Sequence, residues 1–352
     1  MKMEQVFARR LKSARLMREL SMEQLSEKLH KIVSKQSISK YEKGIMFPNS
    51  TVLIELSKAL NLSIDFFFRP YKTDVSDIEF RKKNKLSKTS LKAIKATVLD
   101  RIEKYFEIEN ILNIENPLDS KFKNDNISSS EDVKNIAHKL RVFWKLGEDA
   151  INNVISTLED NGIKLIQLDS DINFDGLSGY VNKKYPVIIV NKNVSPERQR
   201  FTAFHELGHL VLSFNDAIVK KEKEHYCHQF ANEMLIPSSQ FIKLIGNKRK
   251  DISLQELTPI QIQYGISIDA LMYKAKELNI ITKNRYKGYF IKKNSLNEFK
   301  EKVNKSQYPN EESDRFNSLV YRAISKDIIS FSKASSLLGI SVNDIRSSVN
   351  FI

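Results

Sequence analysis

Two histidines and a glutamate lie close together in the segment FTAFHELGHLVLSF, residues 201–214. If this segment is helical, His205 and His209 are four residues apart on one face and direct both imidazoles at one point. Glu206 lies beside them, within reach of a water molecule held at that point. This His-Glu-x-x-His spacing is the one with which zinc is held for peptide hydrolysis. The alternative is that the two histidines are ordinary core residues that bind no metal. The pattern also arises by chance in on the order of one in a hundred chains of this length and histidine content.

A third ligand must come from another element, because a catalytic zinc site normally has three protein ligands and one open position. Four of the six histidines fall within residues 205–228. The segment KEKEHYCHQFANEMLIP (221–237) has helical apolar spacing, and Glu224 starts its buried face. A carboxylate on a buried face needs a partner, and a metal ion would supply one. Glu224 and His228 are therefore rival third ligands, and an exposed first-turn residue is the alternative for Glu224.

The elements that must position these residues also have sequence signals. Ser195-Pro196-Glu197 predicts a helix start upstream of the histidines, with proline at the first helical position. IKLIQL (163–168) and PVIIVN (186–191) are β-branched runs that predict strands, and FDGLSGYV between them predicts a loop and a third strand. Residues 131–147 and 148–162 each predict an amphipathic helix.

Residues 1–70 predict a compact helical unit. Its segment MEQLSEKLHKIVSKQSISKYEKGIMFPNSTVLIELSKAL (22–60) resembles the five-helix Cro/phage-repressor (XRE) type of helix-turn-helix. Ser34 is expected to cap its second, recognition helix. The expected core residues are Leu25, Leu29, Ile38, Tyr41, Leu53, Leu56 and Leu60. The expected DNA-contacting residues are Lys35, Gln36, Ser37, Ser39 and Lys40. This segment holds thirteen Lys/Arg and seven Asp/Glu, which favours double-stranded DNA as a partner. A helical protein-interaction module is the alternative, and a homodimer would suit a two-fold DNA site.

The rest of the chain predicts mostly helix. Residues 71–130 read as a basic helical connector with the run RKKNKLSK (81–88), and NDNISSSED (124–132) reads as a linker ending in a helix cap. Residues 246–352 read as a helical region of unassigned role. It includes a Lys-rich, weakly structured piece around 283–310, and SKASSLLGISVNDI has a helix-turn-helix flavour.

Composition sets the broad class of the protein. The chain has 352 residues and a formal net charge of +14, which favours a polyanionic partner, although a generally basic proteome gives the same balance. Cys227 is the single cysteine, so no intramolecular disulfide can form, as in a reducing cytoplasm. The first residues lack the apolar core of a signal peptide, and no apolar run reaches the length of a membrane span. We therefore expect a cytoplasmic protein with no membrane partner.

The joint pattern RQRFTAFHELGHLVL with EHYCHQFANEMLIP resembles the ImmA/IrrE family of metallo-endopeptidases, and the resemblance extends over roughly residues 130–240. It implies zinc ligands at His205, His209 and Glu224, with Glu206 as the base. His228 stands where the family usually has asparagine, so it is either an alternative ligand or a supporting residue. Tyr180 and Tyr226 are candidate donors to the oxyanion. Members of this family cleave helix-turn-helix repressors, which implies such a repressor as the protein substrate.

The expected architecture is mainly α with a small α+β part. It comprises a helix-turn-helix domain (1–70), the connector (71–130), a zincin-like metallopeptidase domain with a three-stranded sheet (131–245) and a helical region (246–352). The expected function is a DNA-binding regulator, in a mobile-element or stress response, with a zinc-dependent endopeptidase site. Two alternatives stay open: a transcription factor whose zinc is structural or sensory, and a peptidase whose helix-turn-helix grips a protein. Glu206 favours catalysis, because a closed structural site does not need it.

Overall fold

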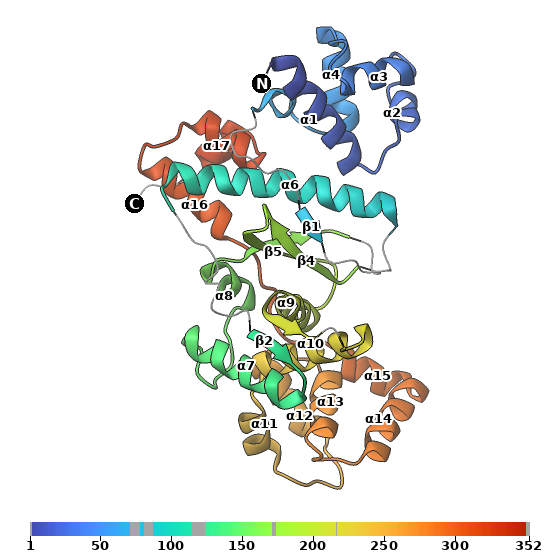
Figure 1. Ribbon diagram of the computed structural model, residues 1–352, viewed down its shortest axis with the longest axis vertical. Helices are drawn as coiled ribbons and strands as arrows, with labels where there is room; N and C mark the ends of the chain where they lie inside the picture. Colours follow the sequence, from blue (N-terminus) through green and yellow to red (C-terminus); the bar gives the residue numbers. More distant parts are fainter. Residues whose placement is uncertain are drawn as a thin grey trace. The chain divides into compact units, whose positions relative to one another are not determined.

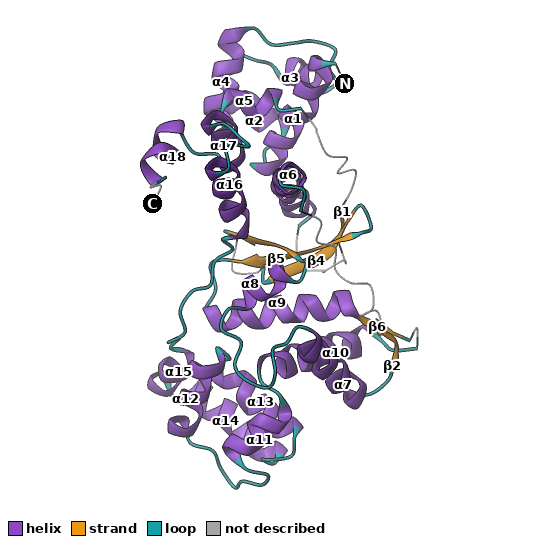
Figure 2. Ribbon diagram, turned by 90° about the vertical axis from the view of Figure 1, so that its left-hand side faces the viewer, coloured by secondary structure: helices purple, strands orange, loops and turns teal. Residues whose placement is uncertain are grey.

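The computed structural model describes residues 2–70, 78–80, 87–114, 124–170, 174–215 and 217–349. The chain divides into two compact units, and the division does not follow the order of the sequence. Unit 1 contains residues 1–78, 83–115 and 314–352, and unit 2 contains residues 79–82 and 116–313. Figures 1 and 2 show that helices dominate both units, and the described strands form one four-stranded and one two-stranded sheet. This confirms the expected fold class.

The N-terminal part of unit 1 is a bundle of five helices around one core. The helices are α1 (Met3–Met17), α2 (Met22–Lys28), α3 (Lys35–Glu42), α4 (Ser50–Leu60) and α5 (Ile64–Phe68). Side chains of Ser21, Ser34 and Asn49 accept hydrogen bonds at the starts of α2, α3 and α4, so the expected cap at Ser34 is confirmed. The expected core residues lie in the bundle's interior, with Leu53 partly buried at its margin.

Unit 1 is completed by helices from the middle and the end of the chain. These are α6 (Lys88–Ile111), α16 (Arg315–Ser325), α17 (Phe331–Leu338) and α18 (Val342–Ser348). The helix expected in the connector is present as the long helix α6 (Figure 1). Its Tyr105 and Ile108 share a buried cluster with Leu319 of α16, Leu337 of α17 and Ile345 of α18. The C-terminal helices are therefore part of the α6 core, whereas residues 81–86 of the basic run lie outside the described residues.

A buried charge network fixes the five-helix bundle to α6. Arg10 of α1 pairs with Glu103 at 2.7 Å, and its Nε donates to the backbone oxygen of Arg69 at 3.0 Å. Arg69 in turn pairs with Asp100. Burial opposes the ionisation of Asp100, but Lys104, Arg69 and Arg10 outweigh it and hold its pKa below its usual range. The bundle and α6 therefore cannot separate without exposing unpaired buried charges.

Unit 2 contains a mixed sheet with the strand order β1-β4-β5-β3. The three expected strands are present as β3 (Lys164–Leu168), β4 (Gly176–Val181) and β5 (Tyr185–Asn191), and β1 (Ile78–Phe80) adds a fourth strand beside β4. β3 runs parallel to β5, whereas β4 is antiparallel to it. Val187, Ile188 and Ile189 on β5 are fully buried, which explains why this strand reads as a continuous apolar run.

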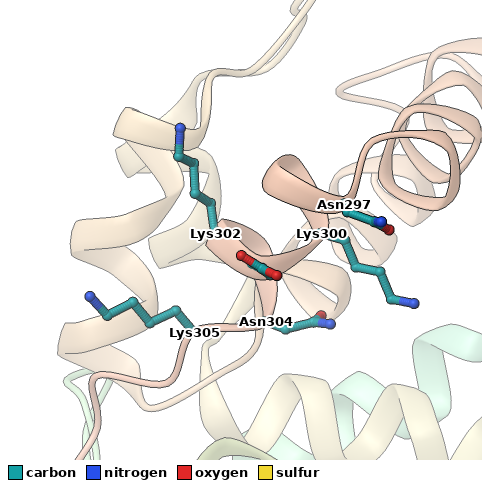
Figure 3. A pocket seen from close by; sticks show the side chains of 6 residues that line it. Asn297, Lys300, Lys302, Asn304 and Lys305 are labelled. Atoms are coloured by element: carbon teal, nitrogen blue, oxygen red, sulfur yellow. The ribbon is translucent and has the colours of Figure 1, made fainter.

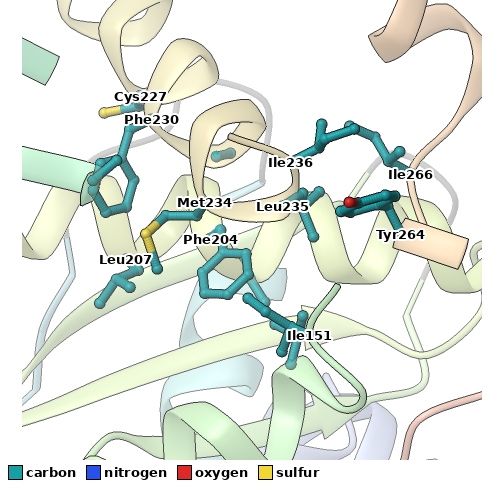
Figure 4. Packing of buried hydrophobic residues seen from close by; sticks show 14 of the residues in the cluster. Ile151, Phe204, Leu207, Cys227, Phe230, Met234, Leu235, Ile236, Tyr264 and Ile266 are labelled. Carbon is teal, nitrogen blue, oxygen red and sulfur yellow. The ribbon is translucent and has the colours of Figure 1, made fainter. Parts of the chain in front are cut away.

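The helices of unit 2 pack against this sheet and against one another. They are α7 (Ser130–Phe143), α8 (Val154–Asp160), α9 (Pro196–Val211), α10 (Lys220–Leu235), α11 (Ser238–Ile245), α12 (Leu254–Tyr264), α13 (Ile268–Glu277), α14 (Lys283–Ser295) and α15 (Asn297–Asn304). In Figure 2, α9 runs along one face of the sheet. Phe204 and Leu207 of α9 meet Phe230 and Met234 of α10 in the main hydrophobic core (Figure 4). This contact holds the helix with the His-Glu-x-x-His residues beside its neighbour.

Three local expectations differ from the structure. Residues 124–127, expected in a linker, form strand β2, which pairs in parallel with β6 (Leu212–Phe214). The helix expected from residue 148 begins only at Val154, because Asn153 caps it. Residues 283–304, expected to be weakly structured, form α14 and α15, where Lys302 pairs with Glu298 one turn away.

The two units also divide the expected C-terminal region. Residues 246–313 belong to unit 2 together with the candidate metal ligands, whereas residues 314–349 pack with α6 in unit 1. The reason is hydrophobic, because α16–α18 complete the core of α6 and α12–α14 complete the core around α9 and α10. Among the described residues, no helix is long and apolar enough to cross a membrane.

Candidate metal centre

The first two candidate ligands lie one turn apart on α9. The helix begins where the sequence predicts, because the Ser195 side chain accepts a hydrogen bond from the Arg198 backbone N–H and Pro196 occupies the first turn. His205 and His209 are 6% and 7% exposed, and their rings lie edge to face with centroids 4.8 Å apart. The helix therefore presents both imidazoles on one buried face.

The third candidate comes from α10, which packs closely on α9. A Cβ on Gly208 would lie 3.2 Å from the Phe230 ring and 3.4 Å from Cys227, so glycine lets the two helices approach. This approach brings the half-buried Glu224 to the two histidines. Hydrogen bonds with His205, and then with His209, hold the pKa of Glu224 well below its usual range. The carboxylate is therefore negatively charged in this cluster.

The distances within the cluster fit a single small cation. The His205 and His209 Nε2 atoms are 3.2 Å apart, and the Glu224 Oε2 lies 3.3 Å from the former and 3.6 Å from the latter. Ligands about 2.0–2.1 Å from a tetrahedral zinc ion are about 3.3 Å from one another. The three atoms thus already have the spacing of one triangular face around such an ion. Two imidazoles and a carboxylate are also a donor set found in catalytic zinc sites.

Glu206 lies between the two histidines in the sequence but turns toward the sheet. Its carboxylate is 1% exposed, and Oε2 accepts a hydrogen bond from the Ser178 hydroxyl of β4 at 2.8 Å. It is not part of the group of three donor atoms that faces a common point. A buried carboxylate next to this group, with a serine hydroxyl among its hydrogen-bond partners, is suited to receive and return a proton.

The other residues named from the sequence, His228, Tyr180 and Tyr226, each have a contact of their own. The His228 ring packs against His205, with centroids 4.5 Å apart, and stacks on Phe201. The Tyr180 hydroxyl donates to the backbone oxygen of Leu210 at 3.2 Å, and the Tyr226 hydroxyl donates to that of Ser128 at 3.2 Å. The structure brings together the donor atoms of His205, His209 and Glu224, whereas the His228 ring packs against His205.

Two neighbours of the cluster were not identified from the sequence. Ser178 holds Glu206, and Cys227 places its Sγ 3.4 Å from Nδ1 of His209. The alternation of β4 gives one usable signal, because Gly176, Ser178 and Tyr180 must share a face of the strand. Nothing in the local sequence shows that this face meets α9.

The candidate DNA-contacting residues lie in unit 1, on α3. Lys35, Gln36 and Lys40 are exposed, whereas Ser37 and Ser39 are half-buried. The Ser37 hydroxyl lies 3.1 Å from the Ser34 hydroxyl, so it takes part in capping the helix. Lys35 forms an exposed ion pair with Glu23 at 3.3 Å. Lys35, Gln36 and Lys40 are therefore the side chains of this set that reach solvent most freely.

A basic hollow of about 710 Å³ lies along α15, in another part of unit 2. Figure 3 shows Lys300, Lys302 and Lys305 around it, and none of its lining residues belongs to the His/Glu cluster. Its lysines are long, solvated side chains on a helix surface. The chemistry that the sequence predicts is therefore at α9 and α10, not in this hollow.

Two protein-family models match the chain, one within each unit. Residues 158–276 match the family model of the IrrE N-terminal-like domain, Peptidase_M78, and residues 11–67 match the helix-turn-helix model HTH_3. The first match contains α9 and α10 and extends through α12 to α13. No curated protein matches the chain. The chain therefore joins an XRE-type helix-turn-helix domain to an IrrE N-terminal-like domain of the M78 metallopeptidase family.

Proposed function

We propose that this protein is a DNA-binding regulator with a zinc-dependent endopeptidase site that cleaves a helix-turn-helix repressor. The observation that carries the proposal is the triangle of His205, His209 and Glu224 donor atoms with the buried Glu206 beside it. His205, His209 and Glu224 would hold the zinc ion. The family match supports a metallopeptidase-type domain, and the helix-turn-helix match supports DNA as a partner.

The chain's own residues supply the proton chemistry of peptide hydrolysis. Bound zinc contributes Lewis acidity, which polarises the scissile carbonyl and makes water more acidic. Glu206 accepts a proton from the attacking water and delivers it to the leaving amine, so that no free charge is left on the nitrogen. Ser178 keeps the carboxylate of Glu206 in place during both transfers. Tyr180 and Tyr226 are the proposed donors to the oxyanion, after exchanging their present carbonyl partners.

The helix-turn-helix unit would direct the peptidase site to particular positions on DNA. When the helix-turn-helix unit is bound to an operator, the local concentration of the peptidase domain rises around other proteins on the same DNA. This gain needs no new contact between the peptidase domain and those proteins. A repressor bound nearby is therefore the substrate class we propose, cut in trans or within this same chain. The test is to incubate the purified zinc-loaded protein with helix-turn-helix repressors from its own genome and to map any fragments by mass spectrometry. Intact repressors, with and without operator DNA, would favour a regulator whose metal is structural or sensory.

Metal binding should depend on all three proposed ligands. We expect about one zinc per wild-type chain, and His205→Ala, His209→Ala or Glu224→Ala should each weaken binding strongly. The expected loss exceeds the roughly 10–100-fold effect of removing an outer hydrogen-bond partner, because a bond to the metal is lost. Competition titration with a zinc chelator measures these affinities.

His138→Ala is the matched control, because His138 is exposed on α7. His228→Ala distinguishes the two candidate third ligands. If Glu224→Ala keeps full zinc affinity while His228→Ala loses it, the assignment of Glu224 is wrong.

DNA binding should depend on salt and on one side chain of α3. Binding should weaken as salt rises, because Lys/Arg contacts to phosphates release counterions. Gln36→Ala should relax base specificity by about 1–3 kcal/mol, the value of one bidentate contact. Fluorescence anisotropy on a set of operator variants measures both effects. Gln5→Ala, exposed on α1, is the control and should leave specificity unchanged.

Two outcomes would contradict the proposal that the helix-turn-helix unit binds specific DNA. One is a DNA affinity that does not change with salt, and the other is equal binding of all operator variants by the wild type. Point substitutions are preferable to deletion of residues 1–70. Such a deletion would remove Arg10 and Arg69 and leave the buried carboxylates of Asp100 and Glu103 without these partners.

A further inference from the structure

We propose that Ser178 is a positioning residue that orients Glu206 for proton transfer, an inference that rests on the proposed peptidase function. Both side chains are 1% exposed, and the Ser178 hydroxyl donates to Glu206 Oε2 at 2.8 Å. A buried carboxylate is costly without hydrogen bonds, and a bond to an ionised group is stronger than one between neutral groups. The hydrogen bond from Ser178 therefore holds the Glu206 side chain in one rotamer.

The sheet fixes Ser178 before any ligand binds. β4 pairs with β5 in an antiparallel register in which Ser178 lies opposite Ile188 and Gly176 opposite Val190. Residues two apart on a strand point to the same side. The contacts of Gly176 with Thr202, of Ser178 with Glu206 and of Tyr180 with Leu210 show that this side faces α9. The hydroxyl of Ser178 is thus aimed by the backbone of two paired strands.

Gly176 sets how closely this strand approaches the helix. A Cβ at Gly176 would lie 2.5 Å from Thr202 Cγ2, 2.9 Å from the Ile189 oxygen and 3.3 Å from Glu206 Cγ. No larger residue fits without moving β4 away from α9. The short serine side chain spans the remaining gap with one good hydrogen bond. Gly176 therefore allows the close approach of β4 to α9, and Ser178 holds the Glu206 carboxylate in position.

The hydrogen bond is placed where it affects proton transfer more than binding. Ser178 contacts Glu206, and the three proposed zinc ligands are donors on other side chains. Loss of the hydroxyl should leave the metal in place and let the Glu206 carboxylate leave its productive rotamer. We expect Ser178→Ala to lower kcat by roughly 10–100-fold, as removal of a partner that orients an active-site group typically does. KM and zinc affinity should stay unchanged.

The decisive comparison uses Ser178→Thr and Ser178→Val, which have nearly the same shape and differ in the hydroxyl. Thr should retain most of the wild-type kcat, whereas Val should lose as much as Ala. Ser156→Ala on α8 is the control for loss of a serine hydroxyl elsewhere in unit 2. In a Glu206→Gln background, Ser178→Ala should cause little further loss, because both changes act on the same carboxylate. Equal kcat for the Thr and Val variants, or additive losses in the double variant, would overturn the inference.

A readout without activity separates this inference from the proposed function. Crystal structures of wild type and Ser178→Ala should show the Glu206 carboxylate turned away from β4 in the variant, with His205, His209 and Glu224 unmoved. If wild type cleaves no substrate and Glu206 still turns in the variant, the proposed function fails and the orienting bond stands. If Glu206 keeps its rotamer in Ser178→Ala, the inference fails whatever the activity.

Discussion

Glu206→Gln is expected to abolish repressor cleavage while leaving the fold, zinc binding and DNA binding intact. Glutamine has the shape of glutamate and can still accept the hydrogen bond from Ser178, but it cannot take up a proton. Loss of a general base costs about 10²–10⁴-fold in rate. Because His205, His209 and Glu224 are untouched, about one zinc per chain should remain. The measurement is the single-turnover rate of repressor cleavage with enzyme in excess.

The same variant tests the link between cleavage and transcription. Wild type and Glu206→Gln should differ in repressor fragments and in transcript levels from the neighbouring operon under inducing conditions. Glu222→Gln, in the first turn of α10, is the matched control and should behave as wild type. No fragments and equal transcript levels in both strains, under every inducing condition tried, would leave a metal-stabilised transcription factor as the better interpretation.

Arg200→Met is expected to destabilise unit 2 by about 3–5 kcal/mol, because it leaves a buried carboxylate without its partner. Arg200 is fully buried on α9 and forms an ion pair with Glu311. It also donates to the backbone oxygens of Ile151 at 2.8 Å and Tyr264 at 3.1 Å. One side chain thus ties α9 to three separate segments. Urea unfolding followed by fluorescence of Trp144, the single tryptophan, reports unit 2, because Trp144 lies in its core.

Arg198→Met on the same helix is the matched control for this prediction. Arg198 pairs with Asp175 at 2.8 Å, but both side chains are largely solvent-accessible, so its loss should cost about 0–1 kcal/mol. A double variant, Arg200→Met with Glu311→Met, should regain part of the stability because no buried charge is left unpaired. A loss below about 1 kcal/mol for Arg200→Met would show that the Arg200–Glu311 pair does not hold unit 2 together.

Local signals in the sequence predict much of the candidate site. Ser195 and Pro196 mark the start of α9, and the four-residue spacing places His205 and His209 on one face. The apolar phase of α10 predicts that Glu224 starts its buried side, and the structure places it at the histidines. Each of these signals acts within one or two helical turns, so each can be read without knowing the fold.

The features that the sequence did not predict depend on contacts between distant residues. Asn124 pairs with Leu212 across nearly ninety positions, and its polar neighbours have no strand pattern, so β2 read as a linker. Ser178 is an ordinary strand serine until α9 places Glu206 against it. Lysines predicted a weakly structured piece near residue 293, but Lys293 is buried and pairs with Asp269 of α13. Packing overrides local composition at each of these positions.

The interleaved course of the chain affects what proteolysis could accomplish. Unit 1 draws on both ends of the protein, and Tyr105 and Ile108 of α6 share a core with Leu319 and Ile345 near the C-terminus. A single cut anywhere within residues 116–313 would therefore give a nicked protein whose two fragments are still joined by one hydrophobic core. Self-cleavage within residues 116–313 would not release the helix-turn-helix domain from the C-terminal helices. The fragments would migrate together on a sizing column and separate only under denaturing conditions.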